Sequence, residues 1–275
     1  MVQHGPSRLH SGEHAFARCG HAPPFWRARA RRARARVVTL SGVTDRAPAD
    51  DPDYLAALTD LLGLLAYAEL VAFFRLSEDA ALAPSIADKA ALGQMAVAEF
   101  GHFELVRGRL VRLGIDSEQA MRPFMAPLDA FHAKTAPSDW PEGLVKAYVG
   151  DGMAADFYRA IAEFLDQDSR ALVLEVLADM GHAAFAVDRV RAAMDADPPL
   201  AGRLALWARR LVGEALGQAQ RVAAERESLA HLIAGGVSSA SGQARDASEL
   251  GDIGRMFARL TDQHARRMAA LGLDA

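Results

Sequence analysis

Apolar residues recur at helical spacing through the chain from residue 53 onward. In the segment 53–79 they return every three or four positions, which is the spacing of one face of an α-helix. The same spacing predicts helices at 85–113, 139–165, 167–197 and 200–234, and an amphipathic helix at 248–271. Half of the residues are hydrophobic and runs of β-branched or aromatic residues are few. The pattern therefore predicts an all-α protein.

The predicted helix ends coincide with residues that favour them. Ser138 and Pro141 stand at the start of the third helix, where a capping side chain and a proline in the first turn are typical. Gly114 follows the second helix, and Pro198-Pro199 follows the fourth. The boundaries therefore rest on two signals, periodicity and the chemistry of helix ends.

A long connection separates the second and third predicted helices. Residues 115–138 contain Pro123, Pro127 and Pro137, which favour at most a short helix between them. A connection of this length is unusual in a compact bundle and is long enough to cross its end or its length. We therefore predict a four-helix bundle with a long crossover between helices 2 and 3, extended by a long fifth helix and a tethered C-terminal helix.

The other segments lack sustained helical periodicity. Residues 1–50 combine Gly, Pro and Ser with an arginine-rich run at 27–36, and we predict a disordered extension there. A basic arm for nucleic acid or an anionic membrane, and a targeting presequence, are the alternatives. Residues 235–247 are predicted to be a Gly/Ser linker. The helical domain is therefore expected at 51–234 and the C-terminal amphipathic helix within 248–275.

Charge is distributed unevenly along the chain. Residues 1–50 hold nine arginines and three acidic residues, a net charge of +6, whereas the remainder holds 22 basic and 32 acidic residues, a net charge of −10. An acidic body argues against a general binder of nucleic-acid backbones. Candidates for a local basic patch nevertheless lie in the fifth helix: Arg203, Arg209, Arg210, Arg221 and Arg226. The single cysteine, Cys19, excludes an intrachain disulfide framework and a cysteine-rich metal site. We expect a cytoplasmic protein without a membrane-spanning helix, because no uninterrupted apolar run reaches about 18 residues.

Two carboxylate–imidazole pairs stand on the apolar faces of the second and fourth helices. Glu99 precedes His102 by three residues, and Asp179 precedes His182 by the same spacing. Three residues make about one helical turn, so both side chains of each pair share one face. A buried carboxylate and a buried imidazole are costly unless they are paired or bind a metal. The repeated pairs therefore indicate either a metal site or two hydrogen-bonded pairs without metal.

Two further carboxylates fit a shared metal site. Glu69 is the one charged residue on the apolar face of the first helix, and Asp151 lies on that of the third, with Asp156 as a rival on a neighbouring face. One carboxylate from each of two helices, and a carboxylate–x–x–His pair from each of the other two, form the di-metal site of such bundles. These ligands suit iron or manganese. The candidate ligands are Glu69, Glu99, His102, Asp151, Asp179 and His182.

The segment from about 53 to 234 resembles the ferritin-like superfamily. Within it, the segment resembles the branch of the non-haem di-iron tRNA hydroxylases that act on isopentenyl-adenosine side chains. The ligand motifs carry this resemblance, together with an actinobacterial-looking stretch at 139–148, Asp-Trp-Pro-Glu-Gly-Leu-Val-Lys-Ala-Tyr. The resemblance implies a di-iron site that activates dioxygen and inserts an oxygen atom into a C–H bond. It further implies a tRNA or a small apolar group as substrate and an external electron donor. Whether the protein forms a homodimer is left open.

The chain departs from the family pattern at two ligand positions. Asp151 and Asp179 stand where glutamates are usual, and an aspartate carboxylate reaches about 1.5 Å less far, one carbon–carbon bond. The nearby glycines Gly150, Gly152 and Gly181 would permit the helices to approach more closely. If they do not, the site holds one metal or none, and the chain is a ferritin-like scaffold that binds a partner.

Overall fold

The structure is a computed structural model that describes residues 51–178, 182–233 and 246–274. The chain divides into two units, 1–45 and 46–275, and every described residue belongs to the second. The predicted extension at 1–50 and nearly all of the predicted linker lie outside the described residues. Within the described ranges all regular structure is helical, so the predicted fold class is confirmed.

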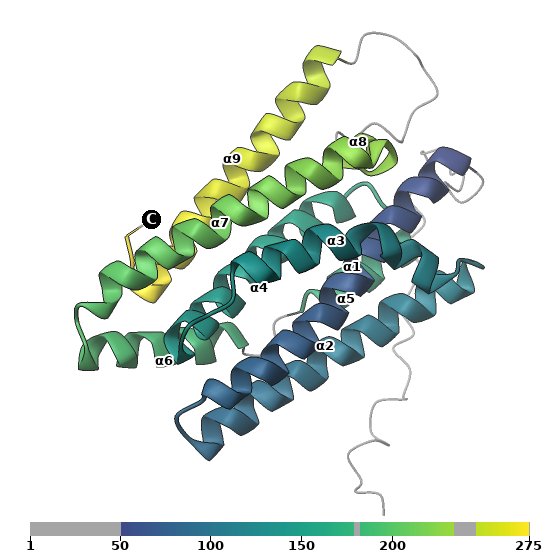
Figure 1. The fold of residues 1–275 in the computed structure, drawn as a ribbon. Coiled ribbons are helices and arrows are strands. Elements are labelled where there is room, and N and C mark those ends of the chain that lie inside the picture. Colours follow the sequence, from purple (N-terminus) through teal and green to yellow (C-terminus); the bar gives the residue numbers. More distant parts are fainter. Residues whose placement is uncertain (1–50, 179–181, 234–245, 275) are drawn as a thin grey trace, which may run out of the picture. The chain divides into compact units, whose positions relative to one another are not determined.

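The helices follow the predicted order, with more breaks than the periodicity indicated (Figure 1). In chain order they are α1 (Pro52–Asp79), the 3₁₀ turn η3 (Ala80–Leu82), α2 (Ile86–Arg112), α3 (Ser117–Lys134), α4 (Trp140–Ala162), α5 (Gln167–Val176), α6 (His182–Ala196), α7 (Leu200–Glu225), α8 (Glu227–Ile233) and α9 (Asp246–Leu271). The cap of α4 lies one residue later than the expected Ser138. Asp139 accepts a hydrogen bond of 3.0 Å from the Glu142 N–H at the start of this helix.

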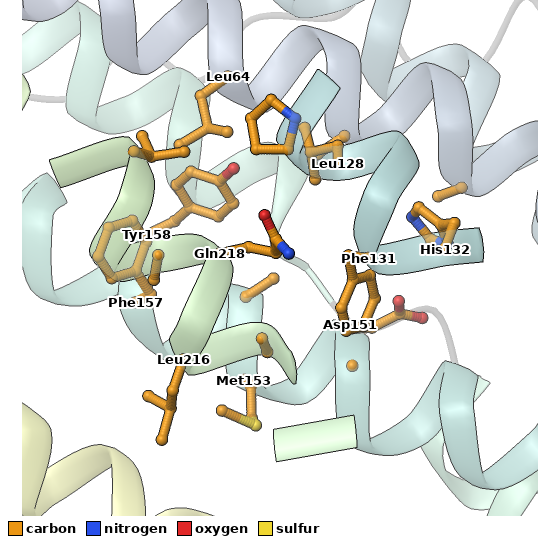
Figure 2. A pocket seen from close by; sticks show the side chains of 18 of the residues that line it. Leu64, Leu128, Phe131, His132, Asp151, Met153, Phe157, Tyr158, Leu216 and Gln218 are labelled. Carbon is orange, nitrogen blue, oxygen red and sulfur yellow. The ribbon is translucent and has the colours of Figure 1, made fainter. Parts of the chain in front are cut away.

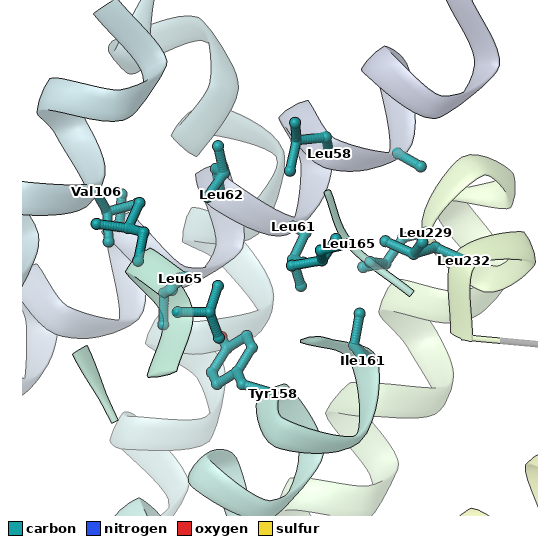
Figure 3. Packing of buried hydrophobic residues seen from close by; sticks show 14 of the residues in the cluster. Leu58, Leu61, Leu62, Leu65, Val106, Tyr158, Ile161, Leu165, Leu229 and Leu232 are labelled. Carbon is teal, nitrogen blue, oxygen red and sulfur yellow. The ribbon is translucent and has the colours of Figure 1, made fainter. Parts of the chain in front are cut away.

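Helix α1 is the centre of the larger apolar core. Leu58, Leu61, Leu62 and Leu65 are almost completely buried against helices from the rest of the chain (Figure 3). Each such side chain stabilises the fold by about 1.5–3 kcal/mol. By length and composition the stretch Pro52–Leu82 is also apolar enough to cross a membrane. Because 56% of its most apolar window is buried inside the protein, we interpret it as a core helix.

The crossover is itself a helix, which the prolines had argued against. Helix α3 contains both Pro123 and Pro127 in its interior, although each proline costs a helix about 3 kcal/mol. Packing offsets this cost, because Ala120, Phe124 and Pro127 are all buried. A Cβ atom added to Gly63 of α1 would lie 2.1 Å from the Ala120 carbonyl oxygen. The close contact between α1 and α3 therefore depends on a glycine.

The fourth predicted helix, 167–197, is interrupted, so this prediction of one continuous helix is wrong. Helix α5 ends at Val176 and α6 begins at His182. The Leu177 carbonyl, which a continuing helix would use, accepts a hydrogen bond of 2.9 Å from the Arg159 guanidinium of α4. At the end of α5 the Ala178 N–H bonds the Glu175 carbonyl, three residues back, at 3.2 Å, so the helix closes in a tighter last turn.

The fifth predicted helix, 200–234, is also divided, at Arg226. The guanidinium of this residue pairs with Asp60 of α1, which is 3% exposed, and Ser228 Oγ donates to the same carboxylate at 2.5 Å. A buried carboxylate needs such partners because its charge is otherwise costly to desolvate. The break between α7 and α8 therefore follows from a charge on a distant helix.

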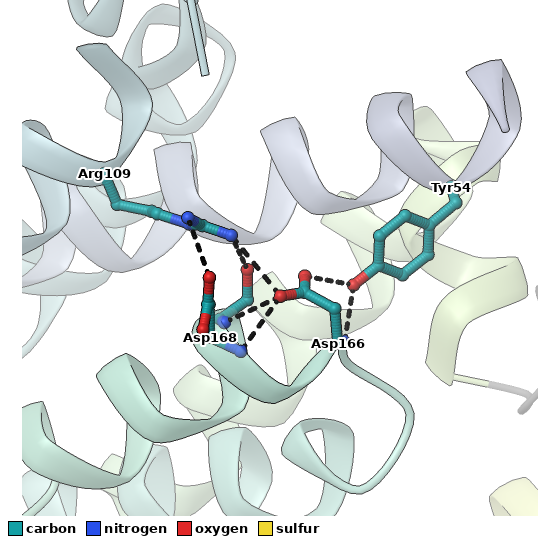
Figure 4. Close-up of polar contacts among 5 residues, drawn as sticks. Tyr54, Arg109, Asp166 and Asp168 are labelled. Atoms are coloured by element: carbon teal, nitrogen blue, oxygen red, sulfur yellow. Dashed lines mark hydrogen bonds and ion pairs between the residues drawn. The ribbon is translucent and has the colours of Figure 1, made fainter. Parts of the chain in front are cut away.

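A polar junction joins α1, α2 and α5 (Figure 4). Asp166 caps α5 by accepting from the Ser169 N–H at 3.0 Å, and it also accepts from the Tyr54 hydroxyl at 2.7 Å. Arg109 of α2 donates to the same carboxylate at 3.3 Å. Burial works to raise the pKa of Asp166, but these hydrogen bonds outweigh it and hold the pKa below its ordinary value.

Helix α9 docks on α4 and α6 within the described unit. Its Met268 and Leu271 are fully buried in the second apolar cluster, which also contains residues of α4 and α7. Arg267 forms an ion pair with Asp156 of α4. The predicted C-terminal amphipathic helix therefore packs against the bundle.

Candidate metal centre and its adjoining cavity

Glu69, Glu99 and His102 meet where α1 and α2 run side by side. Their potential ligand atoms all lie within 4.8 Å of one another. His102 Nδ1 lies 3.3 Å from Glu99 Oε2 and 3.4 Å from Glu69 Oε2. All three side chains are mostly buried, so the tertiary structure brings together the residues that helical spacing singled out.

The three groups perturb one another strongly. Burial raises the pKa of Glu69 well above its ordinary value, and a hydrogen bond to Glu99 raises it further. Burial also works to raise the pKa of Glu99, but hydrogen bonds with His102 and Glu69 outweigh it and lower that pKa. The same two carboxylates raise the pKa of His102 to about 10. The three groups therefore compete for protons, and the pKa of each depends on the charge of the other two.

This donor set fits a metal ion. Two carboxylates and an imidazole within a few ångströms are ligands that iron and manganese accept. A cation would take over the charge compensation that protons otherwise provide, because metal binding displaces protons from such ligands. A hydrogen-bonded cluster without metal would also satisfy the same three groups.

On α4, the structure separates the two rival aspartates. Asp151 lines the same cavity as the three clustered residues, and burial together with the Glu99 charge raises its pKa well above the ordinary value. Lys146 works in the opposite direction. Asp156 instead forms ion pairs with Arg267 and Arg159. Of the two aspartates, Asp151 is therefore the one that lines the cavity of the cluster, although it lies outside the group of three whose ligand atoms are within 4.8 Å of one another.

The second predicted pair is only partly described. His182, the first residue of α6, lines the cavity of the cluster, and its charge contributes to lowering the pKa of Glu99. Asp179 lies outside the described residues. Because α5 ends at Val176, the structure does not place this pair on one continuous helix.

The glycines near the ligands do not have the role that the sequence predicted. An added Cβ would meet nothing within 4 Å at Gly150, so this glycine does not mark a close helix contact, and the same holds for Gly101, which precedes the ligand His102. At Gly152 it would lie 2.1 Å from Arg267 Nε, so this glycine makes room for α9. Gly181 lies outside the described residues. The described glycines thus give no closer approach at the ligands.

A large apolar cavity adjoins the cluster (Figure 2). It measures about 460 Å³, and the cavity of the cluster itself measures about 330 Å³. Asp151 and Tyr158 line both, as do small residues that form a thin wall: Ala68, Ala72, Ala147 and Ala154. A molecule in the apolar cavity would therefore lie next to the candidate metal ligands.

The polar residues of this apolar cavity were not among the candidates indicated by the sequence. Arg75, His132, Lys146 and Gln218 line it from α1, α3, α4 and α7. Lys146 is 6% exposed although it is a lysine. Lys146 follows Leu144 by two residues, which breaks the spacing of the apolar face of the helix. Every residue from Glu142 to Lys146 is nevertheless buried. The sequence pattern therefore gave no signal for Lys146, whose burial is a property of the folded chain.

Comparison with known proteins agrees with the fold. A family model described as a ferritin-like domain of actinomycetes matches residues 52–236. A solved structure from Synechococcus, described as protein 19 with aldehyde deformylating oxidase activity, is similar over 82% of this chain and 98% of that chain. The TM-score is 0.57 and the sequence identity is 19%, a likeness that shows the fold alone. No curated protein matches the chain.

Proposed function

Because the chain belongs to the ferritin-like domain family of actinomycetes, we propose that it is a metal-dependent, oxygen-activating enzyme that hydroxylates a C–H bond of an apolar group. The Glu69–Glu99–His102 cluster beside an apolar cavity carries this proposal. A buried carboxylate–imidazole cluster that is next to a substrate-sized cavity is the arrangement expected of an active site.

Iron is the proposed metal, with manganese as the alternative. Glu69, Glu99 and His102 would hold it together with Asp151, His182 and Asp179. Iron bound there would supply the redox chemistry with dioxygen. Electrons would come from an external donor.

The side chains between the two cavities have their own tasks. The small side chains of the alanine wall leave room for a substrate to approach the ligands, beside a lining that is mostly apolar. Burial and the charge of Glu69 raise the pKa of Tyr158 above its ordinary value, so this phenol stays protonated. Tyr158 therefore offers a hydrogen-bond donor at the boundary between substrate and metal ligands.

The resemblance to tRNA hydroxylases makes an isopentenyl group on tRNA one candidate substrate. Two of the five arginines proposed for a local basic patch form ion pairs within the protein. Arg203 pairs with Asp139 and Glu142, and Arg226 pairs with Asp60. A test therefore decides whether tRNA is the substrate. It compares the modified-nucleoside profiles of tRNA with and without the protein.

Metal content tests the proposal. Protein purified after growth in iron-replete medium should contain about two irons per chain, as a di-iron carboxylate site requires. Glu99→Ala should lose metal, and Glu69→Gln should lose metal while it preserves the hydrogen bonding of a protonated carboxyl group. Glu104→Ala is the matched control, because Glu104 lies on the same helix and pairs with Arg107 at the surface. A metal-free wild-type protein, or Glu99→Ala with full metal content, would overturn the proposal.

A ferritin-like scaffold with a partial or empty site is the second candidate. The break between α5 and α6 favours it, because it interrupts the helix that was predicted to carry Asp179 and His182. About one iron per chain, lost in Glu99→Ala but retained in His182→Ala, would indicate that the α1–α2 side alone binds metal. No metal at all would leave a binding protein.

A further inference from the structure

Exposed apolar side chains are concentrated on the pair of helices α1 and α2. In the described part of the chain, seven of the eleven large hydrophobic side chains that are exposed belong to this pair and its connection. They are Phe74, Leu82, Ile86, Val97, Phe100, Leu105 and Val111. A single exposed apolar side chain is ordinary, whereas a group of neighbours marks a surface that binds a partner.

On α2 these residues follow the outward side of the helix. Val97 and Leu105 stand four residues before and after Gly101, a spacing that places all three on one face. Leu92 and Val106 are buried, and the helical repeat places them on the opposite side. A surface helix normally carries polar residues opposite its buried side. Helix α2 therefore has the pattern of a helix that is covered on both sides.

The outward side of α2 carries few charges. We define the α2 face as the exposed or half-buried residues on this side of the helix: Ile86, Ala87, Ala90, Gly93, Gln94, Val97, Gly101, Glu104, Leu105, Gly108, Val111 and Arg112. Glu104 is paired with Arg107 at 2.7 Å. Arg112, the last residue of α2, is the other charged member. The face is therefore mainly apolar and nearly neutral.

The glycines of the α2 face leave space next to the helix. A Cβ added at Gly93 or Gly101 would meet nothing within 4 Å, and one added at Gly108 would meet only the Arg112 side chain of the same helix. These glycines therefore serve no close contact between described helices, although glycine is unfavourable in a helix interior. Close approach of a backbone from outside would use them.

Phe74 extends the α2 face onto a second helix. The rings of Phe74, Phe73, Phe100 and Phe103 follow one another with centre-to-centre distances of 5.0, 5.3 and 5.6 Å. Phe103 is buried, whereas Phe74 and Phe100 are 51% and 41% exposed. The aromatic cluster thus continues from the core to the surface beside the α2 face.

The size of this surface fits a stable interface. From Ile86 to Val111 the α2 face is about 38 Å long, and the α1–α2 pair is roughly 20 Å wide. This gives about 760 Å², close to the ~800 Å² that each partner contributes to a standard interface. Helix α2 packs mainly on α1, with smaller contacts to α3, α5 and η3, and no described helix covers its outward side (Figure 1).

A second copy of the chain is the partner that this surface favours. A twofold axis brings the same face of both copies together, so a strongly charged face would repel itself. The α2 face avoids this repulsion. In an antiparallel pair centred on Gly101, the two copies of Arg112 would lie about 33 Å apart. The residues of the face also line neither cavity, so the contact leaves the candidate metal centre free.

We propose that the α2 face is a homodimer interface, in which α2 packs antiparallel against α2 of a second copy around a twofold axis near Gly101. Val97 of each copy packs against Leu105 of the other, and the glycines allow the two backbones to approach closely. Phe74 and Phe100 pack at the flank of the contact. The proposal rests on the α2 face and does not depend on the proposed function.

Sedimentation equilibrium of the full-length protein tests the proposal. The wild type should have twice the chain mass of 29.5 kDa. Val97→Lys should raise the dissociation constant of the dimer at least about tenfold, because a charged group would be buried against apolar side chains. Val97 is 69% exposed within one chain, so this variant should fold normally, which circular dichroism verifies.

Leu206→Lys is the matched control. Leu206 is 66% exposed on α7, outside the α2 face, so this variant should dimerise like the wild type. A monomeric wild type, or Val97→Lys that dimerises as tightly as Leu206→Lys, would refute the interface. A wild type that is monomeric alone and associates only with a different protein would also refute it, in favour of a heterologous partner.

A cysteine at the twofold axis locates the contact. Gly101→Cys is made in a Cys19→Ser background, because Cys19 is the one cysteine of the chain. Mild oxidation should link two copies, since residues beside a twofold axis can reach the Cα separation of about 4.4–6.8 Å that a disulfide spans. Leu206→Cys in the same background should stay unlinked. A dimer that Gly101→Cys does not link, or equal linking by Leu206→Cys, would refute the proposed contact.

Discussion

A buried carboxyl group beside a second carboxylate must hold a proton or face a cation, and Glu69 is in this position. Its spacing on α1 indicated a role, because it is charged on an otherwise apolar face. Its partners come from α2, and the raised pKa arises from burial and from Glu99, neither of which is local in sequence. At the residue scale the sequence therefore identified candidates, and the fold decided their ionisation.

His132 leads to a prediction about acid stability. Its pKa falls from 6.5 to about 3 on folding, so the unfolded chain binds a proton that the folded chain refuses. The stabilisation is complete above pH 6.5 and is lost progressively as the pH falls toward 3. When the pH falls from 7 to 5.5, protonation linked to this one group should lower the free energy of unfolding by about 1 kcal/mol.

Urea unfolding at the two pH values measures this loss, and His132→Gln should reduce it. His231→Gln is the control, because the side chain of His231 is exposed on α8. An unchanged pH dependence in His132→Gln would contradict the assignment.

At the scale of elements, helix ends were predicted well when the signal was local. The capping aspartate at 139 and the start of α4 agree with the sequence within a residue or two. At most a short helix was predicted where the 18-residue α3 lies, because its prolines disfavour a helix locally while the burial of Phe124 against the core favours it. The breaks at Leu177 and Arg226 depend on Arg159 and Asp60, which are distant in sequence.

Gly63 tests the contact between α1 and α3. In Gly63→Ala the new methyl group would meet the backbone of Ala120, which cannot rotate away, so we expect a loss of about 1–3 kcal/mol. Gly93→Ala is the matched control, because it lies inside α2 with nothing within 4 Å, and it should gain up to about 1 kcal/mol from helix propensity. Chemical denaturation of both variants measures the difference. Equal stability of the two would show that α3 adjusts without cost.

At the scale of the whole molecule, α9 closes the described unit. It lies beyond the matched family segment, which ends at residue 236. Met256 and Leu260 nevertheless line the apolar cavity, and Leu271 completes the second core cluster. The shape of the cavity therefore depends on a helix that is far from the metal ligands in sequence.

Gly152→Ala should weaken the docking of α9. The added methyl group would displace the Arg267 side chain and break its ion pair with Asp156. We expect earlier proteolytic cleavage near α9 and a lower melting temperature than for Gly150→Ala, whose methyl group would meet nothing within 4 Å. Identical proteolysis of the two variants would mean that α9 is held by its apolar contacts alone.

The sequence by itself determined the helical class, most helix positions, and the residues that meet at Glu69, Glu99 and His102. These follow from periodicity and from the cost of burying a charge, which are local properties. Only the tertiary structure decided that Asp156 pairs with Arg267 while Asp151 faces the cavity, because both aspartates lie on neighbouring faces of one helix. It also formed the apolar cavity, whose lining comes from six helices. The position of each helix depends on packing between residues that are distant in the sequence.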